Sequence, residues 1–251
     1  MERTKLQETN IKNIKAFDWV KYFEYNNSHL LKIDFKNNSE LSKDDIALIT
    51  PSVRAFQIGE GSEGRHLTKC VKKFADKTGY KEYETIMKWF VLEENRHSQT
   101  LKKYMGIYHI EPIKTLWIDN IFRLLRKLTG LECEVIVLVT AEMIALSYYT
   151  ALSNAVNSEV LNIICQQMLN DELKHVVLQS DTLHRISAGR NNIVNNLSRL
   201  IRKIIMRTTA FVVWHKYKTL FLKGGYSYRM FKNHCIEYLK ESIHIEKTGN
   251  L

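Results

Sequence analysis

The chain of 251 residues is long enough for one large domain or for a core domain with extensions. It has only two prolines and ten glycines, which favours long helices over many short strands. Its four cysteines lie far apart and form no CxxC pair, which excludes a zinc ribbon and a thioredoxin-like motif and is typical of a reducing compartment. The N-terminus has no apolar signal segment, and there is no run of about 18 uncharged apolar residues, so we expect a cytoplasmic protein without a transmembrane span.

The net charge of +10 is concentrated near the C-terminus. Residues 185–251 contain thirteen lysines or arginines and only three glutamates, so this segment alone carries a charge of +10 and the rest of the chain is neutral. A basic surface of this kind can meet an acidic carrier protein, lipid head groups or nucleic acid, or it can simply be solvated. An acidic partner at the basic tail is therefore one expectation. A specific nucleic acid is not predicted, because charge alone never identifies a partner.

Residues 1–50 form an N-terminal extension, for which the sequence predicts a short helix and a wrapping loop. Ser42, followed three residues later by Asp45, is typical of a helix start. Pro51 is then expected to open the first long helix, residues 52–77, because proline is favoured at the first helical position. Three glycines weaken this helix locally.

Three more long helices follow, at residues 82–105, 131–155 and 158–186. The only long connection, residues 106–129, contains a short helix of its own at 116–127. Two helix pairs with tight turns and one long connection predict a four-helix bundle with one long crossover.

Two further helices, residues 191–222 and 227–243, complete the chain and are separated by a Gly-Gly pair. The sequence therefore predicts an all-α protein in three parts: an N-terminal extension (1–50), the four-helix bundle (51–189) and a basic C-terminal helical extension (190–251).

Two segments carry the same pattern: an acid, a glutamate, any residue, a base and a histidine. The first contains Glu94 and His97, and the second contains Glu172 and His175. A glutamate and a histidine three residues apart lie on one face of a helix, so both can reach one metal ion. A single motif of this kind usually marks a salt-bridge surface. Two copies, each about 30 residues after another glutamate on its own helix, predict a dinuclear metal site.

A dinuclear site needs one further carboxylate from each of the two remaining helices. Glu142 lies in an otherwise apolar stretch, where burying it unpaired would be costly and a bound cation would offset that cost. On the first helix we choose Glu63 and keep Glu60 as the alternative, because residues equidistant from a hairpin turn lie at the same height. Glu63 precedes Glu94 by 31 residues, close to the 30 residues between Glu142 and Glu172, whereas Glu60 precedes Glu94 by 34.

Other residues near these ligands have two interpretations each. His66 would complete a Glu-x-x-His motif with Glu63, or it is not a ligand. Glu93 and Asp171 directly precede the ligand glutamates and could accept the N–H of a ligand histidine, or they are exposed helix carboxylates. Carboxylates with two imidazoles suit iron or manganese, whereas structural zinc sites prefer thiolates. We therefore predict two Fe ions, with an Mn/Fe pair as the alternative.

Residues 55–179 resemble the ferritin-like diiron carboxylate proteins. Within them, EENRHSQTLKKYM (93–105) and NDELKH (170–175) are most similar to acyl-carrier-protein desaturases. Ala145 stands where those desaturases carry a threonine, and Leu101 where a ribonucleotide reductase small subunit carries its radical tyrosine, so the subfamily stays open. The resemblance implies a ferritin-like four-helix bundle, reduced iron that activates dioxygen to oxidise an organic molecule, and, as ligands, Glu63, Glu94, His97, Glu142, Glu172 and His175.

The leading hypothesis is a non-haem diiron oxidoreductase that activates dioxygen to oxidise a small or carrier-bound organic substrate, acyl groups included. An external electron donor is needed, because the chain has no Gly-rich dinucleotide motif. One alternative is a ferroxidase, iron-handling or peroxide-detoxifying ferritin-like protein. The other is a metal-stabilised binding module that uses the basic tail. A homodimer is one expected assembly.

Overall fold

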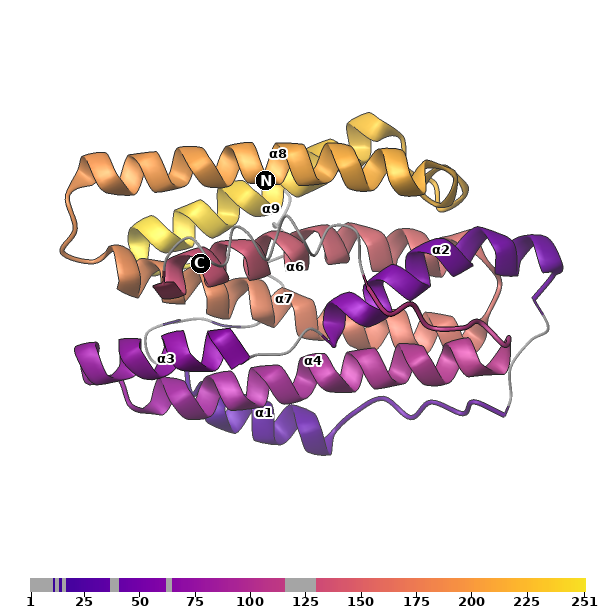
Figure 1. Cartoon of the computed structure of the whole chain (residues 1–251), viewed down its shortest axis with the longest axis horizontal. Helices are drawn as coiled ribbons and strands as arrows, with labels where there is room; N and C mark the ends of the chain where they lie inside the picture. Colours follow the sequence, from indigo (N-terminus) through magenta and orange to yellow (C-terminus); the bar gives the residue numbers. More distant parts are fainter. Residues whose placement is uncertain (1–10, 12–13, 15–16, 37–40, 62–64, 116–129) are drawn as a thin grey trace. The chain divides into compact units, whose positions relative to one another are not determined.

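The computed structural model describes residues 11, 14, 17–36, 41–61, 65–115 and 130–251. In these residues the chain forms helices and no strand, which confirms the predicted all-α class for this part of the protein. The helices, labelled in Figure 1, are α1 (Trp19–Ser28), α2 (Lys43–Glu60), α3 (Arg65–Thr78), α4 (Glu82–Ile107), α6 (Gly130–Ala155), α7 (Glu159–Ser187), α8 (Asn192–Lys223) and α9 (Tyr228–Thr248).

Most helix ends agree with the sequence pattern. Helices α4, α6, α7 and α8 begin and end within two residues of their predicted bounds. Helix α9 continues five residues beyond its predicted end and stops at Gly249, whose φ of +68° is left-handed and whose N–H bonds to the carbonyl of Ile245 at 2.7 Å. A left-handed residue just after a helix favours glycine, so Gly249 is the true stop signal.

The first long helix was predicted wrongly, because residues 52–77 belong to two helices. Helix α2 starts well before residue 52, since the Ser42 hydroxyl accepts the Asp45 N–H at 3.1 Å and donates to the Asp45 carboxylate at 2.7 Å. Pro51, expected at the helix start, therefore lies inside α2. Helix α2 ends at Gly61, one of the three weakening glycines, and α3 is a separate helix. The short helix predicted at 116–127 lies outside the described residues.

Internal contacts divide the chain into two compact units, and each is described by itself. The first unit comprises Met1–Phe17, Val135–Val156 and Met168–Leu251, and the second comprises Asp18–Glu134 and Asn157–Gln167. Helices α8 and α9 therefore belong wholly to the first unit, and α1 to α4 belong wholly to the second. The predicted division of the chain into an N-terminal extension (1–50), a four-helix bundle (51–189) and a C-terminal extension (190–251) stays a prediction.

In the first unit, α8 and α9 pack along each other (Figure 1). The Trp214 and Phe221 rings stack with centroids 5.5 Å apart, and Phe221 lies 4.4 Å from Phe231. Farther along the same two helices, the buried guanidinium of Arg202 is paired with the buried carboxylate of Glu246. The basic C-terminal segment thus forms a helical hairpin with aromatic and ionic contacts between its two helices.

In the second unit, α4 is the central helix and contacts α1, α2 and α3. The Tyr83 ring of α4 lies 5.5 Å from the Phe74 ring of α3, in an edge-on arrangement. Helix α2 is joined to α4 by the Ser98 hydroxyl, which donates to the Gln57 carbonyl at 2.8 Å and accepts from the Gln57 amide at 2.9 Å. This contact holds α2 against the part of α4 that carries the first Glu-x-x-His motif.

Among the described helices, α6 alone is long and apolar enough to cross a membrane. In the most apolar 18-residue stretch of this helix, 83% is buried in the structure, as in the core helix of a globular protein. Helix α6 therefore fills core, and its carboxylate Glu142 is buried with it.

Gly224, the C-cap of α8, lies against the backbone of α6. A Cβ atom at this position would meet the carbonyl oxygen of Ala151 at 2.3 Å, and backbone cannot move aside cheaply. We expect Gly224→Ala to lower the free energy of unfolding by about 1–3 kcal/mol, measured by urea unfolding followed by circular dichroism. Gly106→Ala in α4 is the control, because nothing lies within 4 Å of its Cβ position, and we expect no loss or a gain of up to about 1 kcal/mol. Equal effects of the two variants would contradict the close approach.

Candidate metal centre

Both Glu-x-x-His motifs lie inside long helices, as predicted. Glu94 and His97 belong to α4, and Glu172 and His175 belong to α7. The three-residue spacing puts each pair on one face of its helix. In each unit, a neighbouring helix adds one more glutamate to the pair, so that three possible ligands come together.

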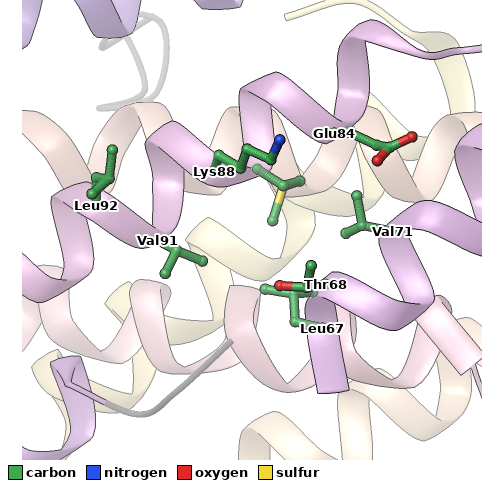
Figure 2. A pocket seen from close by; sticks show the side chains of 8 residues that line it. Leu67, Thr68, Val71, Glu84, Lys88, Val91 and Leu92 are labelled. Carbon is green, nitrogen blue, oxygen red and sulfur yellow. The ribbon is translucent and has the colours of Figure 1, made fainter. Parts of the chain in front are cut away.

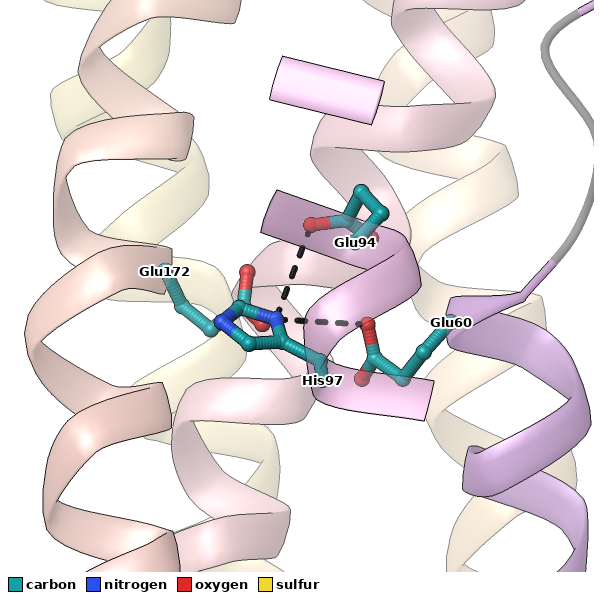
Figure 3. A group of neighbouring side chains, drawn as sticks. All are labelled: Glu60, Glu94, His97 and Glu172. Carbon is teal, nitrogen blue, oxygen red and sulfur yellow. Dashed lines mark ion pairs between the residues drawn. The ribbon is translucent and has the colours of Figure 1, made fainter. Parts of the chain in front are cut away.

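The group in the second unit, here called the α4 group, consists of Glu60, Glu94 and His97. The His97 Nδ1 atom lies 3.8 Å from Glu60 Oε2 and 3.7 Å from Glu94 Oε1. Figure 3 shows the imidazole between the two carboxylates, with Glu60 reaching it from α2. The three residues each offer a ligand atom, and these atoms lie within 4.8 Å of one another. Both Glu60 and His97 are buried.

The group in the first unit, here called the α7 group, consists of Glu142, Glu172 and His175. Glu142 comes from α6 and the other two from α7. The His175 Nδ1 atom lies 3.1 Å from Glu172 Oε2. All three residues offer ligand atoms within 4.8 Å of one another, and the exposed fractions of the residues are 4%, 0% and 0%. This group is therefore shielded from water.

The two groups have the same composition, two carboxylates and one imidazole. Burying carboxylates without a compensating positive charge costs several kcal/mol per ion. A divalent cation offsets this cost, because carboxylate oxygens and an imidazole nitrogen are metal ligands. Each buried Glu/His group can therefore hold a metal ion.

The choice between Glu60 and Glu63 on the first helix is only partly answered. The structure places Glu60, the alternative ligand, in the α4 group. Glu63, the preferred ligand, lies outside the described residues and stays a prediction. His66, the candidate extra ligand, lies on α3, where its Nδ1 atom is 2.6 Å from Glu134 Oε1. Among the described residues, neither group of neighbouring ligand atoms includes it.

The acids that directly precede the ligand glutamates are both buried. Glu93 accepts a hydrogen bond from Arg96 Nη2 at 3.1 Å and another from the Asn26 side-chain amide on α1. Asp171 has no exposed surface. Neither is therefore an exposed helix carboxylate. Their predicted role, to hold the N–H of a ligand histidine, stays a prediction.

Lys174, the base of the second motif, lies against the N-terminal segment. Its Nζ atom is 6.0 Å from the centroid of the Phe17 ring, a cation–π contact. Burial lowers the pKa of its ammonium group to about 8, because low-dielectric surroundings disfavour the charged form. Lys174 therefore loses its positive charge at a lower pH than an exposed lysine does.

One further polar residue on α7 was missed by the sequence analysis. Gln179 is fully buried, and neither atom of its amide has a hydrogen-bond partner among the described residues. It follows His175 by four residues and Glu172 by seven, so it lies on the same helix face as the α7 group. That spacing was the signal in the sequence. An unpaired buried amide is unfavourable unless another molecule satisfies it.

A pocket of about 330 Å³ lies between α3 and α4 (Figure 2). None of the α4 group lines it. Its wall is mainly apolar, with Glu84 and Lys88 as its charged members, and consists of Leu67, Thr68, Val71, Glu84, Met87, Lys88, Val91 and Leu92.

Comparisons with protein-family models, curated protein sequences and solved structures find no match for this chain. The helical architecture of the described residues and the buried Glu/His groups are compatible with a ferritin-like diiron protein.

Proposed function

We propose that the chain is a ferritin-like, non-haem diiron oxidoreductase that activates dioxygen to oxidise a small or carrier-bound organic substrate. One observation carries the proposal: the described residues include two buried groups, each with two carboxylates and an imidazole supplied by a Glu-x-x-His helix and one neighbouring helix. Such doubling is the arrangement of a dinuclear carboxylate centre. In the proposal, the two groups hold two ions as one centre.

The carboxylate and imidazole ligands of the two groups support iron as the bound metal, with an Mn/Fe pair as the alternative. When bound, the metal pair would supply the electrons that reduce dioxygen. The residues of this chain hold the ions, keep bulk water away through the burial of the α7 group, and offer the Gln179 amide to a polar atom of a bound molecule. An external electron donor completes the reaction, and we place the protein in the cytoplasm.

The metal content of the chain tests the first half of this proposal. We expect about two Fe ions per chain after ferrous iron is added to metal-free protein without oxygen. The variant Glu94→Ala/Glu172→Ala should bind almost none while its helicity remains. The matched control, Glu82→Ala/Glu159→Ala, removes two exposed carboxylates from the first turns of the same helices and should bind as much as the wild type. If the well-folded wild-type protein bound no metal, the diiron proposal would be wrong, and a binding module that uses the basic tail would be favoured.

Magnetic and chemical measurements on the loaded protein test the second half. Coupling between the two Fe ions in Mössbauer spectra would support one dinuclear centre, whereas two uncoupled ions would mean two separate sites. Oxygen uptake that depends on an added organic compound, with an oxidised product, would support the oxidoreductase. Rapid iron oxidation without any organic product, from a chain that elutes as a large shell, would instead support the ferroxidase alternative.

A further inference from the structure

Helix α8 has two apolar faces. Its inner face packs on α9 (Figure 1) and contains buried residues such as Met206, Ala210 and Val213. At about 100° per residue, a second set of apolar residues lies on the opposite side of the helix. We call this set the outer stripe; its members are 44–75% exposed and are Ile193, Val194, Leu197, Leu200, Ile201, Ile204 and Phe211.

The outer stripe follows one side of the helix. Leu197, Leu200, Ile204 and Phe211 succeed one another at spacings of three, four and seven residues, which keep them on one face. From Ile193 to Phe211 the stripe extends about 27 Å at the helical rise. The outward face of a surface helix is ordinarily polar. An exposed apolar stripe of this kind is typical of a site that binds a protein or a membrane.

The charges of α8 are all positive. The helix contains seven lysines or arginines and no acidic residue. Two of the seven, Arg199 and Arg202, are paired with Glu246 of α9. At about 100° per residue, Lys203 and Arg207 lie along one edge of the outer stripe. The remaining five cations are exposed: Lys203, Arg207, Lys216, Lys218 and Lys223.

The C-terminal end of the outer stripe is aromatic. The Phe211 and His215 rings lie 4.0 Å apart, and the His215 ring lies 6.2 Å from the Tyr228 ring of α9. Lys232 Nζ is 6.0 Å from the centroid of Tyr228. Amphipathic rings beside cations are typical of the boundary between lipid and water.

We propose that the outer stripe of α8 binds the surface of an anionic lipid membrane, with the helix lying in the plane of the interface. The exposed aliphatic side chains would enter the acyl boundary, and the lysines and arginines at the edge would meet the lipid phosphates. A second copy of the chain is a poorer occupant, because two such helices would bring together five exposed cations from each copy, and α8 has no carboxylate to oppose them.

Flotation of the full chain with lipid vesicles tests this proposal. We expect binding to vesicles of phosphatidylcholine mixed with phosphatidylglycerol and little binding to phosphatidylcholine alone. Raising the salt from about 0.1 M to about 1 M, which shortens the Debye length from about 10 Å to about 3 Å, should weaken binding strongly. Lys203→Gln/Arg207→Gln should weaken it about 30-fold, and Leu197→Gln/Ile204→Gln at least about tenfold.

Matched variants away from α8 are the controls. Leu31→Gln/Leu92→Gln replaces two exposed leucines of the second unit, and Lys72→Gln/Lys73→Gln replaces two exposed lysines of α3. Both should bind vesicles as the wild type does, and all variants should keep wild-type helicity. Vesicle binding that Leu197→Gln/Ile204→Gln leaves unchanged would overturn the proposal. A second result would also overturn it: a wild-type chain that is a dimer and does not bind vesicles, and that Leu197→Gln/Ile204→Gln converts to a monomer. The stripe would then bind a second copy of the chain. Binding to an acidic polypeptide but not to vesicles would also overturn it.

Discussion

Ferrous iron, added without oxygen to metal-free protein, is expected to raise the midpoint of thermal unfolding by about 5–10 °C. A cation that binds only the folded chain stabilises it by mass action, and the α7 group is built from fully or almost fully buried ligands. Replacing Glu172 by glutamine should remove most of this shift. Without metal, the Glu172→Gln protein should be at least as stable as the wild type, because the substitution removes one of two neighbouring buried carboxylates.

The diagnostic result is therefore a reversal. The Glu172→Gln variant should unfold at or above the wild-type temperature without metal and below it with metal, measured by differential scanning calorimetry. Glu159→Gln, an exposed carboxylate in the first turn of the same helix, is the control and should follow the wild type in both conditions. A wild-type protein that iron does not stabilise, or a Glu172→Gln variant that iron stabilises equally, would contradict the assignment of Glu172 as a ligand.

Glu246→Leu is expected to lower the free energy of unfolding by about 3–5 kcal/mol. The substitution leaves the Arg202 guanidinium, only 1% exposed, without its carboxylate in the core between α8 and α9. Arg202→Met should cost less, because the Nε atom of Arg199 still donates to Glu246 at 2.9 Å. The double variant Arg202→Met/Glu246→Leu should recover most of the loss, because it removes the buried guanidinium together with its carboxylate.

Urea unfolding followed by far-UV circular dichroism measures these four proteins. Arg207→Met makes the same change at an exposed arginine of the same helix and should alter stability by at most about 0.5 kcal/mol. If Glu246→Leu cost no more than Arg207→Met, the ion pair would not be closed to water. If the double variant were as unstable as Glu246→Leu, lost packing rather than an unpaired charge would be the cause.

Local sequence patterns were sufficient for most helices. Apolar periodicity and glycine stops are local properties, so the bounds of α4, α6, α7 and α8 could be predicted closely. The pairing of glutamate and histidine on α4 and α7 is equally local, because three residues always bring two side chains to one helix face. Ser42 was correctly predicted as a helix start, but the first long helix was expected to open at Pro51, which lies inside α2.

The choice between Glu60 and Glu63 needed more than local pattern. The equal-height rule assumed one unbroken helix over residues 52–77, advancing by a constant rise per residue. The chain instead leaves the helix at Gly61, so the rule does not apply across that position. The burial of Glu93, Asp171 and Gln179 also depends on neighbouring helices, which periodicity does not describe.

The sequence by itself predicted the helical class that the described residues show, the two Glu-x-x-His motifs on separate helices, and the net positive charge of the C-terminal segment. Only the tertiary structure showed which glutamates join each histidine, and that the single carboxylate of Glu246 pairs with both Arg199 and Arg202. It also decided which apolar face of α8 is covered. A period of 3.6 residues reveals that a helix has apolar faces, but packing against α9 selects the one that is buried and leaves the other exposed.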